Sequence, residues 1–254
     1  MKWQAIARND LRGAGHKRGV WGLFAGFLVG FGGLAVLLIQ LGNPEFGEYL
    51  DLLRAGVELL VPLAGIVLGY EAVIGERESG RAVLSLSMPL SRADLIAGKL
   101  AGRTVLFAVV IAAASFITGV GIALTFPAFQ VSRYIGFIIV STAYGTVFLW
   151  LSAAFSMALS TSRRVIVVAF GAYIGLTLSW ALLIDIVETI LFRFQPTGSG
   201  DPETWATFAT FVGPTTSFNY LLGEVLNIGT VPPVADTSSA EFITPTVAIL
   251  AFVA

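Results

Sequence analysis

The stretch GERESGRAVLSLSMPLSRADLIAGK, residues Gly75 to Lys99, mixes charges of both signs with apolar residues and lies between two segments apolar enough to cross a bilayer. Its charged opening consists of Glu76, Arg77, Glu78 and Arg81. The apolar residues that follow recur at helical spacing: Val83, Leu86 and Leu90 at i, i+3 and i+7, and Leu84 and Met88 at i and i+4. The pattern predicts a short helix with one apolar stripe.

A corner and a second helix follow this stripe. Pro89 ends the short helix because it removes a backbone donor and restricts Met88 before it. Ser91 and Asp94 have the spacing of a capping box, which starts a new helix, and apolar residues continue from there. The sequence therefore predicts a short helix outside the bilayer, a corner and a transmembrane helix.

The composition belongs to an all-α membrane protein. Of 254 residues 56% are hydrophobic and 12% charged, against roughly 25% charged in soluble domains. The chain has no cysteine, which excludes disulfides, thiolate metal sites and a cysteine nucleophile. The net charge of -1 gives no indication of a nucleic-acid partner.

Six apolar segments predict six membrane spans within a single transmembrane domain, residues 1–254. They are residues 20–41, 55–74, 100–126, 134–160, 165–191 and 242–254. The last segment is shorter than the roughly 20 residues that a spanning helix needs. We therefore expect the sixth helix to be incomplete in this sequence, with a re-entrant or interfacial hairpin as the alternative.

The segments between the spans carry their own predictions. In residues 1–19 one helical face is apolar, which predicts an amphipathic interfacial helix; the alternative is a basic orientation signal without fixed structure. That face consists of Trp3, Ile6, Ala7 and Leu11. Residues 42–54 are expected to form an outer loop. Residues 192–241 are expected to form a long extracytoplasmic loop whose short helices rest aromatic faces at the membrane interface.

A glycine repeat in the first span predicts close helix packing. Gly22, Gly26 and Gly30 recur every four residues, a spacing that lets another helix approach closely. We expect that neighbour within the same chain rather than in a second copy.

The distribution of positive charge predicts the topology. Twelve of the 15 Lys and Arg residues fall on one side of the predicted spans, and only Arg54, Arg133 and Arg193 on the other. This positive-inside bias places the N-terminus and the Gly75 to Lys99 stretch in the cytoplasm of a multi-pass protein of the cytoplasmic membrane. Arg163 and Arg164 form a second inner loop, either a partner contact or a plain topological anchor.

Three acidic residues near span ends are candidates for a transport pathway. Glu58 is predicted about one turn from the outer end of the second span, and Asp185 and Glu188 near the outer end of the fifth. Each has a structural alternative: snorkelling or an interhelical hydrogen bond for Glu58, and the water boundary of the helix for Asp185 and Glu188.

Most catalytic chemistry is excluded. The sequence has no G-x-x-x-x-G-K-[ST] phosphate loop, so the chain is not itself an ATPase. His16 is the only histidine, which excludes a catalytic triad and a two-histidine zinc site. We expect no enzyme activity, no metal site and no directly bound cofactor.

The Gly75 to Lys99 stretch resembles the first cytoplasmic loop of ABC-2-type transporter permeases, in the branch that includes the permease of the nitrous-oxide reductase maturation system. The likeness lies in the order Glu76-Arg77, Glu78-Ser79-Gly80, Ser87-Met88-Pro89-Leu90-Ser91-Arg92 and Gly98-Lys99. It implies a six-transmembrane-helix bundle with an N-terminal elbow helix and a cytoplasmic coupling helix that docks on a separate ABC ATPase subunit.

The resemblance also implies site residues and partners. ATP and magnesium would bind the partner ATPase, and two permease chains, identical or related, would pair with two ATPase chains in an exporter. The ATPase-docking residues would be Glu76, Arg77, Glu78, Arg81, Val83, Leu84, Leu86, Met88 and Arg92. Two other functions stay open: an ion-coupled secondary transporter, and a membrane assembly or immunity factor that binds a partner without transport.

Overall fold

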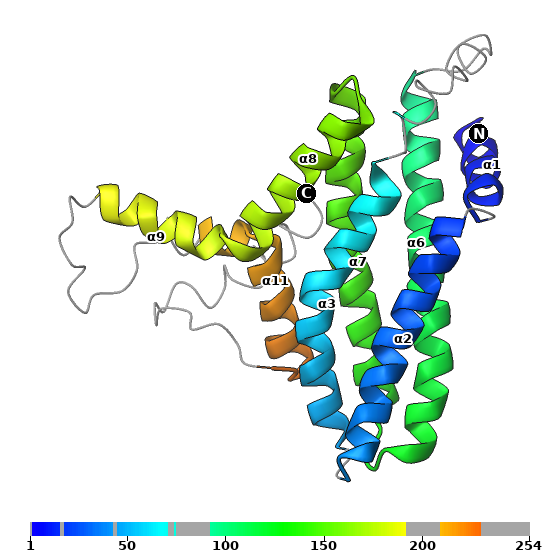
Figure 1. Cartoon of the computed structure of the whole chain (residues 1–254), viewed down its shortest axis with the longest axis vertical. Coiled ribbons are helices and arrows are strands. Elements are labelled where there is room, and N and C mark those ends of the chain that lie inside the picture. The colour runs from blue at the N-terminus through cyan, green and yellow to red at the C-terminus, as the bar shows by residue number, and fades with distance from the viewer. Residues whose placement is uncertain are drawn as a thin grey trace. The chain divides into compact units, whose positions relative to one another are not determined.

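A computed structural model of the chain is entirely helical in its regular elements over the residues that it describes (Figure 1). These are residues 2–15, 18–42, 45–70, 74, 92–191 and 209–229. The chain divides into two compact units, residues 1–170 and residues 171–254.

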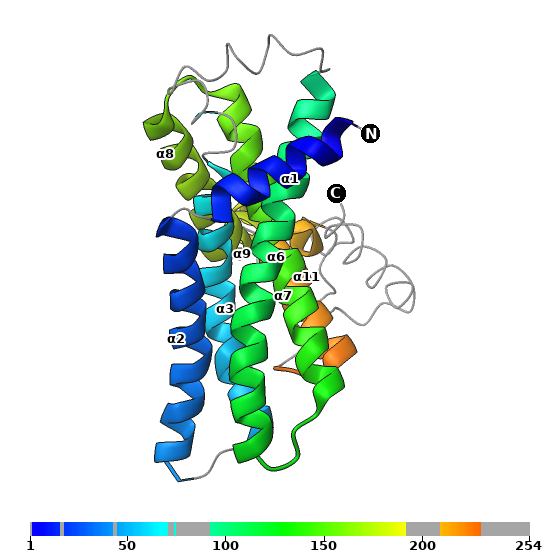
Figure 2. The ribbon, with the colours of Figure 1, turned by 90° about the vertical axis from the view of Figure 1, so that its right-hand side faces the viewer.

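The first unit is a bundle of long helices with a short one beside it. Four helices are long and apolar enough to cross a membrane: α2 (Arg18–Gln40), α3 (Phe46–Gly69), α6 (Arg92–Thr125) and α7 (Val131–Ala158). The predicted spans at residues 20–41, 100–126 and 134–160 are thus confirmed as helices of spanning length. The short helix α1 (Lys2–Gly15) lies across α6 (Figure 2).

The second predicted span begins earlier and ends earlier than expected. We expected a loop up to Arg54, but α3 starts at Phe46 and ends at Gly69. The reason is a helical apolar repeat: the buried side chains of Phe46, Tyr49, Leu50 and Leu53 are spaced i, i+3, i+4 and i+7. Acidic residues such as Glu48 lie on the exposed side of the same turns, so their charge did not indicate a loop.

The core of this unit is the tight contact between α3 and α7. A Cβ added at Gly65 would meet the Gly145 carbonyl oxygen, and one added at Gly69 would meet the Leu149 carbonyl oxygen. Glycine lets the two backbones come this close. Tyr144 is fully buried in the same contact and donates a hydrogen bond from its hydroxyl to the Glu58 carbonyl oxygen at 3.2 Å.

The prediction of one continuous helix over residues 165–191, the fifth span, was wrong. Helix α8 (Ser162–Tyr173) passes into a π-helical turn at Ile174–Leu178, and Ser179 then leaves the α-helical region before α9 (Trp180–Leu191). Contacts from far along the chain hold this break. The Trp180 indole Nε1–H donates to the Ala209 carbonyl oxygen at 3.0 Å, and the Trp180 ring lies against Gly213.

Within the predicted extracytoplasmic loop the second unit contains helix α11 (Pro214–Tyr220), followed by a π-helical turn at Leu221–Val225. The expectation of a short helix here is confirmed. Phe211, Phe218 and Tyr220 are buried, and the Phe211 and Tyr220 rings pack edge to face with centroids 5.1 Å apart. Their position at the membrane interface stays a prediction. Trp205 and Phe208 lie outside the described residues.

Candidate functional site

The predicted docking stretch, residues 75–99, follows the end of α3 and extends into the first turns of α6. Helix α6 begins at Arg92, directly after Ser91, which is where the capping box predicts a helix start. The Arg92 side chain is outside the described part of the chain, as are Glu76, Arg77, Glu78, Arg81, Val83, Leu84, Leu86 and Met88. Their docking role therefore stays a prediction, and the structure describes the helices that carry the stretch.

The residue just before this stretch, Ile74, is fixed to the end of α7. Ile74 is fully buried, and its backbone N–H donates to the Ser156 hydroxyl oxygen at 2.9 Å. One turn earlier the Ser152 hydroxyl donates to the Ile66 carbonyl oxygen at 3.2 Å. Both serines are fully buried, so the last turns of α7 satisfy backbone groups at and just beyond the end of α3.

The N-terminal half of α6 buries two cations, Lys99 and Arg103. The Arg103 Nε–H donates to the Asp10 carboxylate at 3.0 Å, and its Nη1–H donates to the Leu68 carbonyl oxygen at 3.0 Å. Both residues belong to the twelve cations of the positive-inside count, and Lys99 also to the Gly98-Lys99 part of the family motif, but the ion pair of Arg103 with Asp10 was not predicted. A signal for the pair was nonetheless present, because Asp10 is the single acidic residue in a basic segment and a cation within an apolar helix needs a partner.

The N-terminal helix packs on α6 through the face predicted to be apolar. Ile6, Ala7 and Leu11 are half-buried there. Gly102 of α6 permits the approach, since a Cβ at this position would lie 3.0 Å from the Ala7 carbonyl oxygen. Residues 2–15 are thus a fixed helix rather than an unstructured signal, and their place in the headgroup layer stays a prediction.

The predicted second inner loop presents exposed cations. Arg163 and Arg164 lie in the first turn of α8, and the Arg164 Nη1–H reaches the Ser160 hydroxyl at 3.5 Å. Positive side chains oppose the helix dipole at this end. Their exposed position at this end of α8 fits an anionic surface outside the chain, either lipid headgroups or a protein partner.

The three acidic residues predicted to be candidates for a transport pathway differ in position and exposure. Glu58 lies near the middle of α3 and is half-buried, so its predicted place one turn from the outer end was wrong, because α3 begins nine residues earlier than expected. Asp185 is exposed on α9, and the Glu188 side chain is outside the described part. Among the described residues no cluster of three or more His, Cys, Asp or Glu side chains is placed to hold a metal ion.

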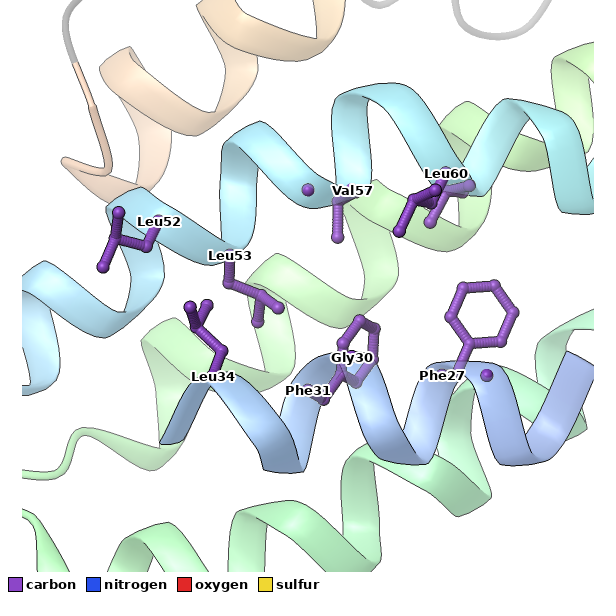
Figure 3. Close-up of a pocket in the computed structure, with 11 residues that line it drawn as sticks. Phe27, Gly30, Phe31, Leu34, Leu52, Leu53, Val57 and Leu60 are labelled. Atoms are coloured by element: carbon purple, nitrogen blue, oxygen red, sulfur yellow. The ribbon is translucent and has the colours of Figure 1, made fainter. Parts of the chain in front are cut away.

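A groove of about 160 Å³ lies between α2 and α3 (Figure 3). Its walls are apolar and consist of Gly26, Phe27, Gly30, Phe31 and Leu34 with Leu52, Leu53, Gly56, Val57, Leu60 and Val61. A Cβ at Gly22, Gly26 or Gly30 would meet no atom within 4 Å. Among the described residues, then, no helix of this chain fills the glycine repeat, contrary to our expectation.

Comparisons with known proteins agree with this architecture. The family described as ABC-2 family transporter protein matches residues 4–254. Two curated relatives are each named "Probable ABC transporter permease protein NosY". The one from Stutzerimonas stutzeri is 31% identical over 211 residues, which are 78% of this chain and 73% of the relative. The one from Pseudomonas aeruginosa is 30% identical over 131 residues, which are 50% of this chain and 46% of the relative.

These matches confirm the family resemblance drawn from the Gly75 to Lys99 stretch. They also agree with the four described helices of spanning length. The chain therefore belongs to the ABC-2 transporter family and is a multi-pass permease subunit of an ABC transporter.

Proposed function

We propose that this permease exports its substrate across the cytoplasmic membrane, driven by a separate ATPase subunit that docks on residues 75–99. The observation that carries the proposal is how firmly the helices beside the docking stretch are held. Ser156 of α7 anchors Ile74 on one side, and Arg103 joins α6 to α1 and α3 on the other. Because these helices are anchored, a force that the ATPase applies to residues 75–99 is transmitted to the helix bundle and does not merely deform the stretch.

Charge supports the orientation. The positive-inside bias places the docking stretch and the Arg163–Arg164 pair on one side of the membrane, the cytoplasmic side, where ATP is available. The arginine pair, which is exposed among the described residues, then forms a second contact for an anionic surface of the ATPase.

The transport unit in this proposal has two permease chains, identical or related, and two ATPase chains that bind ATP and magnesium. The cargo is an amphipathic or lipid-like molecule, in keeping with the apolar surfaces of the spanning helices. Direction and cargo rest on the family resemblance and on this composition.

One observation favours the ion-coupled alternative. Glu58 lies half-buried near the middle of a spanning helix, which is where a coupling acid of a secondary transporter is expected. Glu58→Gln tests this alternative directly, because an ATP-driven exporter keeps its dependence on ATP in that variant and an ion-coupled transporter loses its dependence on the ion gradient.

The test of the proposed function is affinity purification of the tagged chain from native membranes in mild detergent, with mass spectrometry of what is retained. We expect a stoichiometric partner that carries a phosphate-binding loop. Leu84→Glu puts a charge on the predicted apolar stripe and should lose that partner. Ser85→Glu is the matched control, since Ser85 lies off the stripe and the partner should stay bound.

Two results would contradict the proposal. A clean preparation of the wild-type chain without any ATPase would favour the ion-coupled or assembly functions. Equal retention of the ATPase by wild type and Leu84→Glu would place the docking surface elsewhere.

A further inference from the structure

One buried guanidinium joins three helices of the first unit. Arg103 lies on α6, donates from Nε to the Asp10 carboxylate of α1 and donates from Nη1 to the Leu68 carbonyl oxygen of α3, both at 3.0 Å. The Arg103 side chain is 7% exposed and the Asp10 side chain 17%. We call Asp10, Arg103 and the Leu68 carbonyl the three-helix clamp.

The chemistry of each member suits its place. Leu68 belongs to the last turn of α3, whose carbonyls have no partner within the helix and carry the negative end of its dipole. Arginine sends separate N–H groups to that carbonyl and to the carboxylate, in directions fixed by its planar fork. Lysine, a single point charge on a flexible stem, does not hold two acceptors in this geometry.

The clamp connects the helices on both sides of the docking stretch. Helices α3 and α6 are the two that flank residues 75–91, and Arg103 lies about three turns into α6. The clamp therefore attaches α1 to both helices that lead into the docking stretch. Gly102 brings α1 close enough for this, as the 3.0 Å approach of its added Cβ to Ala7 shows.

We propose that Arg103 is a positioning residue that makes α1, the end of α3 and the start of α6 move as one body when the ATPase acts on the docking stretch. The inference rests on the proposed function for the ATPase and adds a mechanical role for the N-terminal helix. In it, α1 bears part of the force that reaches the spans.

The first experiment measures whether α1 is held by the clamp. The chain has no cysteine, so Gln4→Cys on α1 and Ala93→Cys at the start of α6, both exposed positions, carry the only two spin labels. Pulsed electron paramagnetic resonance on the full chain in lipid nanodiscs should give one narrow distribution of the distance between the two labels. Asp10→Asn removes the carboxylate charge and should broaden it, whereas Asp10→Glu should keep it narrow.

Arg8→Gln is the matched control. Arg8 lies on the same helix and is exposed, so its substitution removes one charge without touching the clamp. We expect the wild-type distribution. An unchanged distribution in Asp10→Asn and in Arg103→Lys would overturn the proposal.

The second experiment separates positioning from folding. In complexes with the co-purified ATPase, Asp10→Asn should retain the ATPase at wild-type stoichiometry while the stimulation of ATP turnover by the permease falls about five-fold or more, as expected for a lost coupling between sites. Asp10→Glu should restore the stimulation. Loss of retention and turnover in equal proportion would mean that the clamp only supports the fold, and would overturn a positioning role.

The two proposals fail in different ways. If the wild-type chain retains no ATPase, the proposed function is wrong and the positioning role falls with it. If the ATPase is retained and Asp10→Asn couples normally, the proposed function stands and the inference about Arg103 is wrong.

Discussion

Two glycine faces of the first unit differ sharply in what they contact. Gly65 and Gly69 of α3 lie directly against the backbone of α7, where an added Cβ would overlap a carbonyl oxygen. Gly26 and Gly30 of α2 have the same four-residue spacing, yet an added Cβ there would meet no atom within 4 Å. Glycines at this spacing permit close approach, but what approaches depends on the surrounding helices.

The difference follows from what stands opposite each face. Tyr144 of α7 is fully buried beside the α3–α7 contact, donates from its hydroxyl to the Glu58 carbonyl oxygen of α3 and packs edge to face on Phe148. On α2 the neighbouring side chains Phe27 and Phe31 point toward α3 and hold it off, which leaves the glycines at the edge of the groove (Figure 3). The α3–α7 contact is thus closed and the α2 face open.

The largest expected effect comes from breaking the closed face. Gly65→Leu forces the α3 and α7 backbones apart, because even its Cβ has no room beside Gly145. We expect a loss of about 3 kcal/mol or more in the free energy of unfolding, at the upper end for overpacked cores. Unfolding in mixed detergent followed by circular dichroism measures it. The control Gly22→Leu, on the open face, should unfold as wild type does, and a similar loss there would contradict the comparison.

A smaller effect is expected at a third glycine contact. Gly102→Leu should displace α1 from α6, since the added Cβ lies 3.0 Å from the Ala7 carbonyl oxygen and 3.3 Å from the Asp10 Cβ. Because a single short helix can shift, we expect a loss of about 1–3 kcal/mol. Protease cleavage within residues 2–15 should become faster. Unchanged cleavage would show that α1 accommodates the side chain.

Ser156→Ala tests the hydrogen bond at the end of the closed α3–α7 contact. It removes the acceptor for the buried Ile74 N–H and leaves that donor without its hydroxyl partner. The expected loss is about 1–2 kcal/mol, the usual range for a buried donor left unsatisfied. Hydrogen exchange at Ile74 should rise in this variant, and equal exchange in Ser156→Ala and wild type would remove Ser156 from the anchor. Ser160→Ala, at an exposed hydroxyl beyond α7, is the control.

The smallest effect is expected on the open face. Gly26→Ala adds one methyl group to the groove without a clash, and alanine favours helix over glycine. We expect the unfolding free energy to change by no more than about 0.5–1 kcal/mol, in the stabilising direction. Thermal unfolding of the purified chain checks it. A destabilisation would show that another surface already packs against Gly26.

Much of the first unit could be predicted from the sequence because its spans are long apolar runs. Residues 20–41 and 134–160 differ from α2 and α7 by only a few residues at each end. The start of α3 was missed because Glu48 and its neighbouring acids suggested a loop, although the buried repeat from Phe46 to Leu53 was already present. Charge outweighed periodicity in that prediction, and periodicity was the better guide.

The parts that sequence reasoning missed depend on distant partners. The break at Ser179 is held by Ala209 and Gly213, about 30 residues further on, and no local pattern in residues 165–191 indicates it. Arg103 was counted as one charge among many because its partners, Asp10 and Leu68, lie on two other helices. The docking residues themselves, from Glu76 to Met88, stay predictions that rest on the family motif.

The contact of Asp10 with Arg103 also has a consequence for the order in which the protein is made. Ribosomes synthesise chains from the N-terminus, so α1 exists before α6 has been translated. Ninety-three residues separate the two charges. Until α6 has been synthesised, the carboxylate of Asp10 lacks the Arg103 guanidinium as its partner. Docking of α1 through this ion pair therefore has to wait until α6 has been synthesised.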